Sequence, residues 1–292
     1  MIFPISKDLY LVYAPNGAKF PYCHCLLVDG DVKVLFDTGC GEEDLAVLKE
    51  LKPDIIINTH YHEDHILHNA DFPESRIWAH RLDAPAISSR EAFKEYFGFT
   101  AFDKDQLGEE FLDYVQLQPT PVDRELENGD VLDFGRLKFR VVHAPGHSAG
   151  HCAFHLEENN TLLTGDIDLS NFGPWYGNVS SDLEDFIQSI KKCQEINPDF
   201  LISSHKGIIA DNIQERLQKY LDIIFQREEK ILRALETPLT LDQLAAKRIF
   251  YGDRFQGNEL YGLMEKIAIT KHLEKLMRLG EIEKDTEVYF RK

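Results

Sequence analysis

A short histidine-rich stretch offers the most concentrated chemistry in the chain. Its four donors, which lie within six residues directly after the apolar run Ile55–Asn58, are His60, His62, Asp64 and His65. Four such side chains cannot all share one face of a strand or a helix, so we expect a loop that wraps them around a metal ion. Imidazole and carboxylate together suit zinc, iron or manganese. Burying these groups without a cation would leave costly unpaired polar atoms.

Three further candidate donors each follow a predicted strand. His147 comes shortly after Leu137–His143, Asp166 after Thr161–Leu163, and His205 after Phe200–Ser204. Strand ends that open into loops are places where scaffolds of helices and sheets collect functional groups. Each of these residues alone is a weak signal. Together with the histidine-rich loop they predict one shared metal site.

These residues, together with Asp37 in the sequence Phe36-Asp37-Thr38-Gly39, stand in the order of the five motifs of the metallo-β-lactamase superfamily. The stretch 37–205 therefore resembles that superfamily, and its H-x-H-x-D-H core is highly specific. The resemblance implies an α/β fold, the αββα sandwich, with a two-metal site at one edge of the sheets.

Carried over residue by residue, the resemblance implies three ligands for each of two metals and one bridging ligand. The first metal would be bound by His60, His62 and His147, the second by Asp64, His65 and His205, and Asp166 would bridge the two. Asp37 would lie outside the ligand set and hold the histidine loop by hydrogen bonds, as outer carboxylates do for metal-bound imidazoles.

The same pattern separates branches of the superfamily. His62 stands where the redox diiron relatives carry a glutamate, and no flavodoxin-like domain follows, which disfavours electron transfer. A cysteine ligand for the second metal is absent, because that position is Asp64. The complete ligand set resembles thioesterases of the glyoxalase II type, lactonases and nucleases.

The charges of the expected site indicate hydrolysis. Two divalent ions bring more positive charge than Asp64 and Asp166 neutralise, and this excess would stabilise a metal-bridging hydroxide at neutral pH. That hydroxide would attack a carbonyl or phosphoryl centre, and Asp64 would carry the proton to the leaving group. Zinc is the default metal for a histidine-rich site, although iron and manganese accept the same ligands.

The spacing of apolar residues predicts two strand-rich halves, each closed by a helix and then a strand. Residues 81–118 break this pattern, since their aromatic residues sit among charges without alternation. We expect a helical insertion there that lies over the site. Ser181 is the expected N-cap of a helix over Asp182–Glu195.

Composition changes near residue 211. The 292 residues carry a net charge of −18, of which 1–211 hold −19 and 212–292 hold +1, from 15 Lys and Arg against 14 Asp and Glu. Helices are predicted over Ile213–Leu235, Leu241–Phe250 and Glu259–Leu279, and a hairpin follows. This order predicts a metallo-β-lactamase-like domain over 1–211 and a winged-helix-like domain over 212–292.

The third of these helices carries five basic residues, namely Lys266, Lys271, His272, Lys275 and Arg278. In a winged helix it would be the element that enters a major groove. Glu265 and Glu274 interrupt the set, however, and nucleic-acid modules are usually more basic. We therefore favour packing over the rim of the site or homodimerisation over nucleic-acid binding.

Aromatic residues follow Asp166 closely and are candidates for a substrate pocket: Phe172, Trp175 and Tyr176, whose hydroxyl could face the developing oxyanion. Lys206, next to His205, is a candidate contact for an anionic substrate. The five cysteines show no C-x-x-C spacing and are expected to be free and buried. No secretory signal and no membrane-spanning run is evident, so we expect a cytoplasmic protein.

Three hypotheses about function follow. The first is a metal-dependent hydrolase of a small thioester, ester or lactone. The second is a metal-dependent endoribonuclease whose winged helix holds RNA. The third is a DNA-binding regulator whose metal domain senses a ligand. A closed aromatic pocket would favour the first, a basic channel the second, and a symmetric dimer with two basic helices the third.

Overall fold

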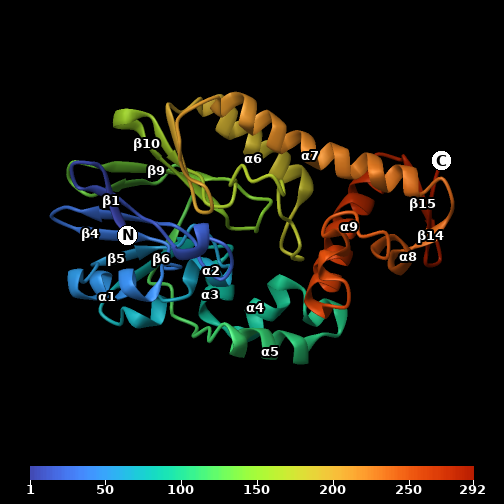
Figure 1. The fold of residues 1–292 in the computed structure, drawn as a ribbon, viewed down its shortest axis with the longest axis horizontal. Coiled ribbons are helices and arrows are strands. Elements are labelled where there is room, and N and C mark those ends of the chain that lie inside the picture. The colour runs from blue at the N-terminus through green and yellow to red at the C-terminus, as the bar shows by residue number, and fades with distance from the viewer.

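Short runs of β-branched and aliphatic residues form the strands of two sheets that pack face to face, with helices on both outer faces (Figure 1). In the computed structural model the backbone is described over 1–292, and the side chains over 1–253 and 256–292. The first sheet has seven strands in the order β1-β2-β3-β4-β5-β6-β7, and the second has six in the order β13-β12-β11-β10-β9-β8. This is the αββα sandwich that the sequence predicts.

The first sheet is antiparallel through β4 and parallel from β4 to β7. Its strands are β1 (Ile2–Ser6), β2 (Leu9–Val12), β3 (Cys25–Asp29), β4 (Lys33–Phe36), β5 (Ile55–Ile57), β6 (Arg76–His80) and β7 (Arg124–Leu126). Helix α1 (Glu42–Leu51) connects β4 to β5 and buries Leu45 and Leu48. β5 has three isoleucines that are all buried, which is typical of a parallel strand covered on both sides.

The second sheet pairs β11 and β12 in parallel and its other neighbours antiparallel. Its strands are β8 (Val131–Asp133), β9 (Lys138–His143), β10 (Cys152–Leu156), β11 (Thr161–Leu163), β12 (Phe200–Ser203) and β13 (Gly207–Ile209). Helix α6 (Leu183–Ile196) lies between β11 and β12 in the chain. Its N-cap is Asp182 rather than the predicted Ser181, because the Ser181 hydroxyl donates instead to the carbonyl of His147, 2.8 Å away.

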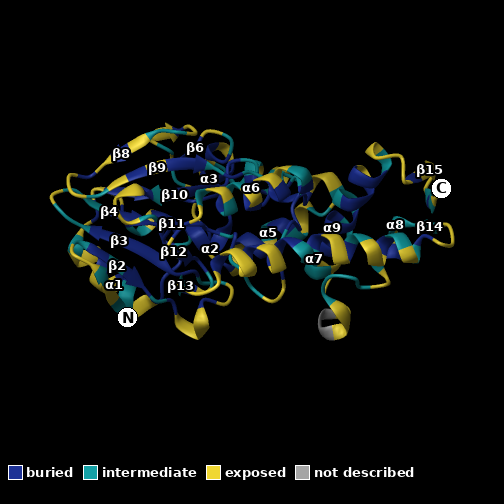
Figure 2. Cartoon of the chain, turned by 90° about the horizontal axis from the view of Figure 1, so that it is seen from above, coloured by how far each residue is buried: buried dark blue, intermediate teal, exposed yellow. Residues whose placement is uncertain are grey.

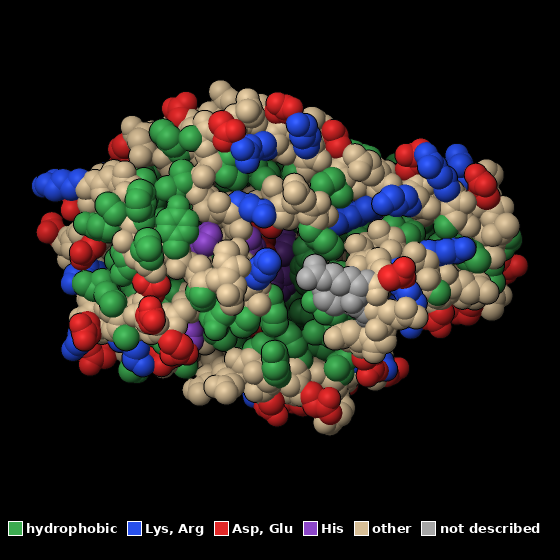
Figure 3. Space-filling view, viewed as in Figure 1, with side chains coloured by type: hydrophobic (Ala, Val, Ile, Leu, Met, Phe, Trp, Pro, Cys, Tyr) green, Lys and Arg blue, Asp and Glu red, His purple; other side chains and the backbone are tan. Residues whose placement is uncertain are grey.

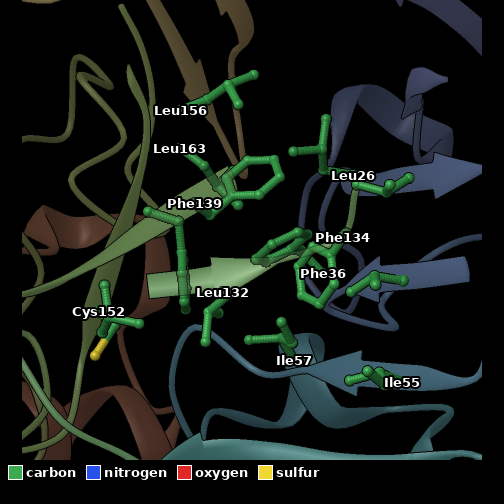
Figure 4. Close-up of a cluster of buried hydrophobic side chains, with 14 of the residues drawn as sticks. Leu26, Phe36, Ile55, Ile57, Leu132, Phe134, Phe139, Cys152, Leu156 and Leu163 are labelled. Atoms are coloured by element: carbon green, nitrogen blue, oxygen red, sulfur yellow. The ribbon is translucent and has the colours of Figure 1, made fainter. Parts of the chain in front are cut away.

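Aromatic and aliphatic side chains from both sheets fill the space between them (Figure 4). The ring of Phe36 lies 4.9 Å from that of Phe139 and 5.0 Å from that of Phe154, measured between centroids. Leu26 and Ile57 from the first sheet and Leu163 from the second belong to the same cluster. Burial of this apolar surface holds the two sheets together and fixes how the loops at their edge face one another.

The expected insertion over 81–118 is helical. It holds α3 (Ala84–Ser88), α4 (Arg90–Phe97) and α5 (Asp105–Tyr114), and the short α2 (Glu63–Ile66) precedes it. Phe93, Phe97 and Phe111 form a buried cluster there. The insertion lies beside the C-terminal helix α9, since Leu263 and Ile267 belong to that cluster too (Figure 1).

The C-terminal part has the predicted order of helices, followed by the expected hairpin. It comprises α7 (Ile213–Ala234), α8 (Leu241–Ala245), α9 (Glu259–Arg278) and the strands β14 (Leu239–Thr240), β15 (Ile282–Asp285) and β16 (Val288–Arg291). Strand β14 pairs with β16 of the hairpin, so the sheet has three strands in the order β14-β16-β15. Thr240 caps α8 in a capping box. The winged-helix assignment and the domain boundary at 211 stay predictions.

Helix α7 belongs to both parts of the molecule (Figures 1 and 2). Its first half packs Leu217, Leu221 and Ile224 against α6, while Ile231 lies in the core of the C-terminal part. Arg227 of this helix is 4% exposed. Its guanidinium group donates to the carbonyls of Phe172 and Pro174 in the loop after β11. The C-terminal helices are thus bonded directly to a loop of the sandwich.

Two further findings concern membrane-spanning helices and the state of the cysteines. Within the part of the chain that the structure describes, no helix combines the length and the apolar character needed to cross a bilayer. All five cysteines are free and buried, as predicted.

Replacing Arg227 by Met should lower the free energy of unfolding by about 3 kcal/mol, because the carbonyls of Phe172 and Pro174 lose a buried donor. The matched control is Arg216→Met on the same helix, whose exposed guanidinium pairs with Asp211 and should cost less than about 1 kcal/mol. Denaturant unfolding measures both. Equal losses in the two variants would contradict the anchoring role of Arg227.

Candidate metal centre

The loops that carry the predicted donors meet at one edge of the sandwich. His60 and His62 lie in the loop after β5, and Asp64 and His65 belong to the first turn of the helix that follows it. The other three donors follow β9, β11 and β12, which run in the same direction in the second sheet. Strand ends that point the same way bring their loops to one edge, so all seven donors come together there.

Three imidazole nitrogens form the first group. His62 Nδ1 lies 2.9 Å from His60 Nε2 and 2.8 Å from His147 Nε2, and the last two atoms are 3.1 Å apart. The three residues are 1%, 4% and 1% exposed for His60, His62 and His147 respectively. Three nitrogens this close in a buried site must share protons or a cation.

The second group consists of Asp64, His65 and His205. His205 Nε2 lies 3.5 Å from Asp64 Oδ2, and His65 Nε2 lies 3.8 Å from Asp64 Oδ1. Asp166 stands between the two groups. Its Oδ1 is 3.0 Å from His65 Nε2 and 3.2 Å from His205 Nε2, while its Oδ2 is 3.3 Å from His147 Nε2. The geometry matches the bridging position that the resemblance implies for this carboxylate.

Outer partners set the orientation of the rings. His65 Nδ1 donates to Asp37 Oδ2 at 2.8 Å, His147 Nδ1 to the carbonyl of Trp175 at 2.9 Å, and His205 Nδ1 to the carbonyl of Ala18 at 2.7 Å. Because Nδ1 is engaged in each ring, Nε2 is the atom left to bind a cation. Asp37 also accepts from the backbone and the hydroxyl of Thr59 at 2.8 and 2.9 Å, so it lies where the sequence places it, behind the histidine loop.

The donor set fits divalent cations. His65 Nε2 and Asp166 Oδ1 are buried and lie 3.0 Å apart, yet neither has a hydrogen-bond partner of suitable geometry among the described residues. Burial opposes a charge on His205, yet the Asp166 and Asp64 carboxylates raise its pKa to about 10. Protein atoms alone therefore draw positive charge into this site, which a metal ion would supply.

In the first group the pKa values of the histidines are lowered instead of raised. Burial, together with the neighbouring imidazoles, holds the pKa values of His60 and His62 well below the usual range. Burial also lowers the pKa of His147 to about 4. These rings are neutral at physiological pH, which is the state in which imidazole binds a metal.

His151 is not a ligand but supports one. Its Nδ1 donates to the carbonyl of Ala144 at 2.9 Å, and its Nε2 accepts from the backbone N–H of Asp166 at 3.0 Å. Gly165 precedes Asp166 with φ +52°, and a Cβ there would come within 2.6 Å of His151 Nε2. Glycine is thus required for the turn that presents the Asp166 carboxylate.

A cavity of about 270 Å³ opens above the donors. Figure 3 shows this hollow, with histidine side chains in its depth and hydrophobic side chains around it. Its polar base includes His62, Asp64, His147, Asp166 and His205. The walls are mainly aromatic or apolar and include Phe20, Phe97, Phe111, Phe172, Trp175, Tyr220, Leu260, Tyr261 and Met264. Among the described side chains, no Lys or Arg lines the cavity.

Of the four predicted pocket residues, two line the cavity and two do not. Phe172 and Trp175 line the cavity. Tyr176 does not: it is 1% exposed, and its hydroxyl lies 2.9 Å from His272 Nε2 of α9. Lys206 is exposed and lies outside the cavity lining, so its predicted contact with an anionic substrate is not supported.

Several cavity residues were not identified from the sequence. Glu63 and Asp168 add carboxyl groups, and burial beside Asp64 raises the pKa of Glu63 to about 8. The position of Glu63 inside the H-x-H-x-D-H motif is a signal that could have found it. The wall formed by α9 had no local signal, because Leu260 and Met264 look like ordinary core residues of a helix.

The basic residues of α9 have partners within the chain, and the pairs of Lys266 and Arg278 lie on the surface. Lys266 pairs with Asp242 at 2.6 Å, Lys275 with Glu228 at 2.7 Å and Arg278 with Glu184 at 2.8 Å. Lys271 donates to the carbonyl of Val179 at 2.8 Å, and His272 is fully buried. The helix therefore packs over the rim of the site, which is one of the two roles that the sequence favoured.

Comparisons with known proteins identify relatives of this chain. An atrochrysone carboxyl ACP thioesterase of Aspergillus fumigatus is 26% identical over 220 residues, which are 72% of this chain and 58% of that protein. A β-lactamase-like protein 2 homologue of Caenorhabditis elegans is 25% identical over 266 residues, which are 88% of this chain and 79% of that protein. The chain aligns with less than two thirds of the length of the thioesterase.

Solved structures share the fold. A metallo-β-lactamase family protein from Thermus thermophilus superposes with a TM-score of 0.78 at 25% identity, covering 99% of this chain and 100% of that one. A protein crystallised in a di-iron-bound form is 27% identical, with a TM-score of 0.52 over 68% of this chain and 96% of that one. The family model of the metallo-β-lactamase superfamily matches residues 18–205, which include all seven donors, and the chain belongs to that superfamily.

Proposed function

We propose that the chain is a dinuclear metal-dependent hydrolase of a small thioester, ester or lactone with an apolar acyl group. The observation that carries this proposal is the convergence of seven imidazole and carboxylate donors, two with orphaned atoms, at the base of an aromatic cavity. Fungal relatives that are named thioesterases support an acyl substrate. Two bound divalent cations would supply an activated water and a Lewis acid for the carbonyl oxygen.

The residues of the chain would perform the remaining tasks. The aromatic walls, with Phe97 and Trp175 nearest the histidines, hold the acyl group and exclude bulk water. Asp64 lies at the cavity floor beside His205 and moves the proton to the leaving group. Asp166 keeps the two donor groups at a fixed separation, because each of its oxygens faces a different group.

The identity of the metal belongs to the same proposal. We expect zinc because most of the donors are imidazoles, while iron and manganese accept the same ligands. Iron is the alternative metal, because a similar protein was solved in a di-iron-bound form. A cytoplasmic location and a homodimer stay predictions from the sequence.

Cleavage of RNA, the alternative hypothesis, has less support. The cavity lacks Lys and Arg among its described lining residues, and the cations of α9 are paired within the chain. A nuclease or a DNA-binding regulator needs free cations to contact phosphates.

His60→Ala should remove about one of two bound zinc equivalents and lower thioester turnover by more than the ~100-fold that loss of an outer partner can cause. His155→Ala is the matched control, since His155 binds Asn160 at the far end of β10 and should keep both equivalents. Elemental analysis and a thiol-release assay measure the two quantities. Full activity in metal-free H60A would contradict a metal mechanism.

Met264→Trp should raise KM for an arylacyl thioester roughly tenfold, because the larger side chain fills the cavity from α9. An acetyl thioester, which is smaller than the cavity, should be affected less. Met277→Trp on the same helix is the control, because Met277 packs in the C-terminal core. Equal effects of M264W on both substrates would show that α9 does not select the acyl group.

Zinc-loaded protein should neither cleave single-stranded RNA nor lose thioester turnover when RNA is added. This follows from the lack of Lys and Arg among the described residues that line the cavity. Gel analysis of labelled RNA and a competition assay test it. Competitive inhibition by RNA at physiological salt would instead favour the endoribonuclease.

A further inference from the structure

A buried carboxylate outside the donor set joins the two loops that supply the first histidine group. Asp83 precedes α3 and is 0% exposed. Its Oδ2 accepts from the backbone N–H of Tyr61 at 3.1 Å and from the hydroxyl of Ser148 at 2.6 Å, and its Oδ1 accepts from the backbone N–H of Gly150 at 2.6 Å. None of the five motifs of the superfamily includes this residue.

The partners of Asp83 lie next to the histidines. Tyr61 stands between His60 and His62, and Ser148 directly follows His147. The first loop leaves β5 of one sheet, and the second leaves β9 of the other. The distance between these loops therefore depends on how the two sheets face each other at this edge. A carboxylate that accepts hydrogen bonds from both loops fixes that distance locally.

The backbone at Gly150 approaches Asp83 closely. A Cβ at Gly150 would lie 2.7 Å from the backbone nitrogen, Cγ and Oδ1 of Asp83, so only glycine allows this approach. A second tie between the same segments runs from the backbone N–H of Cys152 to the carbonyl of Thr59 at 2.8 Å. Asp83 adds a tie at the residues that directly adjoin His60, His62 and His147.

We propose that Asp83 is a positioning residue that sets the spacing of His60, His62 and His147 for the first cation. The inference rests on the proposed metal-dependent function. The three nitrogens lie within 3.1 Å of one another, and metal sites tolerate errors of only about 0.5 Å in donor position. Loss of the tie would let the two loops separate and weaken the first site, while the second site, which Asp83 does not contact, would be retained.

The test is titration of metal-free protein with cobalt(II), whose absorption in the visible region reports the coordination of each site. Wild type should bind two equivalents. Asp83→Asn should bind the first-group cobalt about 10–100-fold more weakly, because its amide places N–H donors against the donors of the loops. The second equivalent should bind as in wild type. Ser148→Ala, which removes one of the three bonds, should weaken the first site less.

Asp123→Asn is the matched control. Asp123 Oδ2 also accepts a backbone N–H, that of Ile77 in β6, at 2.7 Å, and the backbone N–H of Asp123 donates to the carbonyl of Ile77 as well rather than to either histidine loop. This variant should bind both equivalents normally even if its melting temperature falls. A comparable loss of the first site in D123N would assign the effect to general stability and overturn the proposal.

Further outcomes are decisive. Folded D83N that binds both equivalents with wild-type affinity and spectrum overturns the role of Asp83 and leaves the proposed function intact. Wild type that binds no cobalt overturns the proposed function and this inference with it. If D83N fails to fold, Ser148→Ala decides: a weakened first site supports the tie, and an unchanged one overturns it.

Discussion

Electrostatic crowding at one buried edge of the sandwich governs the rest of this structure. Five imidazoles and two carboxylates place their donor atoms within a few ångströms of one another, where burial limits their solvation by water. Such a group is costly unless each atom has a partner. Asp37, His151 and the carbonyls of Ala18 and Trp175 partner the outward-facing atoms, which leaves the inward-facing lone pairs for a cation. The folded scaffold thus directs its unsatisfied atoms to one place.

The C-terminal helices complete the site rather than standing apart from it. Helix α7 packs against α6 at one end and against the C-terminal core at the other, and Arg227 bonds it to the loop that carries Phe172. Helix α9 then covers the opening between the insertion and that loop. Its apolar face closes the cavity, and its cations are held by acidic neighbours.

Most strands and the candidate donors could be predicted from local signals, whereas the αββα arrangement was implied by the resemblance of the motif order to the superfamily. Apolar runs such as Ile55–Ile57 and Thr161–Leu163 specify buried strands, and donors directly after them lie at strand ends wherever the sheets go. Strands β1, β6, β7, β13 and β14 were not predicted, since runs of two to five residues are too short to show a clear periodic pattern. Ser181 was wrongly assigned as a helix cap because its local sequence suits a cap. Its hydroxyl instead has a partner that is distant in the chain, the carbonyl of His147.

Sequence by itself therefore determined which atoms can bind metal and in what order they occur along the chain, because these properties depend on residue type and on spacing over a few positions. Tertiary structure alone decided which side chains surround them. Phe97, Phe111 and Met264 line the cavity while Tyr176 does not, and Asp83 ties two loops from different sheets. These contacts join segments that are far apart in the chain, and their geometry follows from packing of the whole core, which no local pattern encodes.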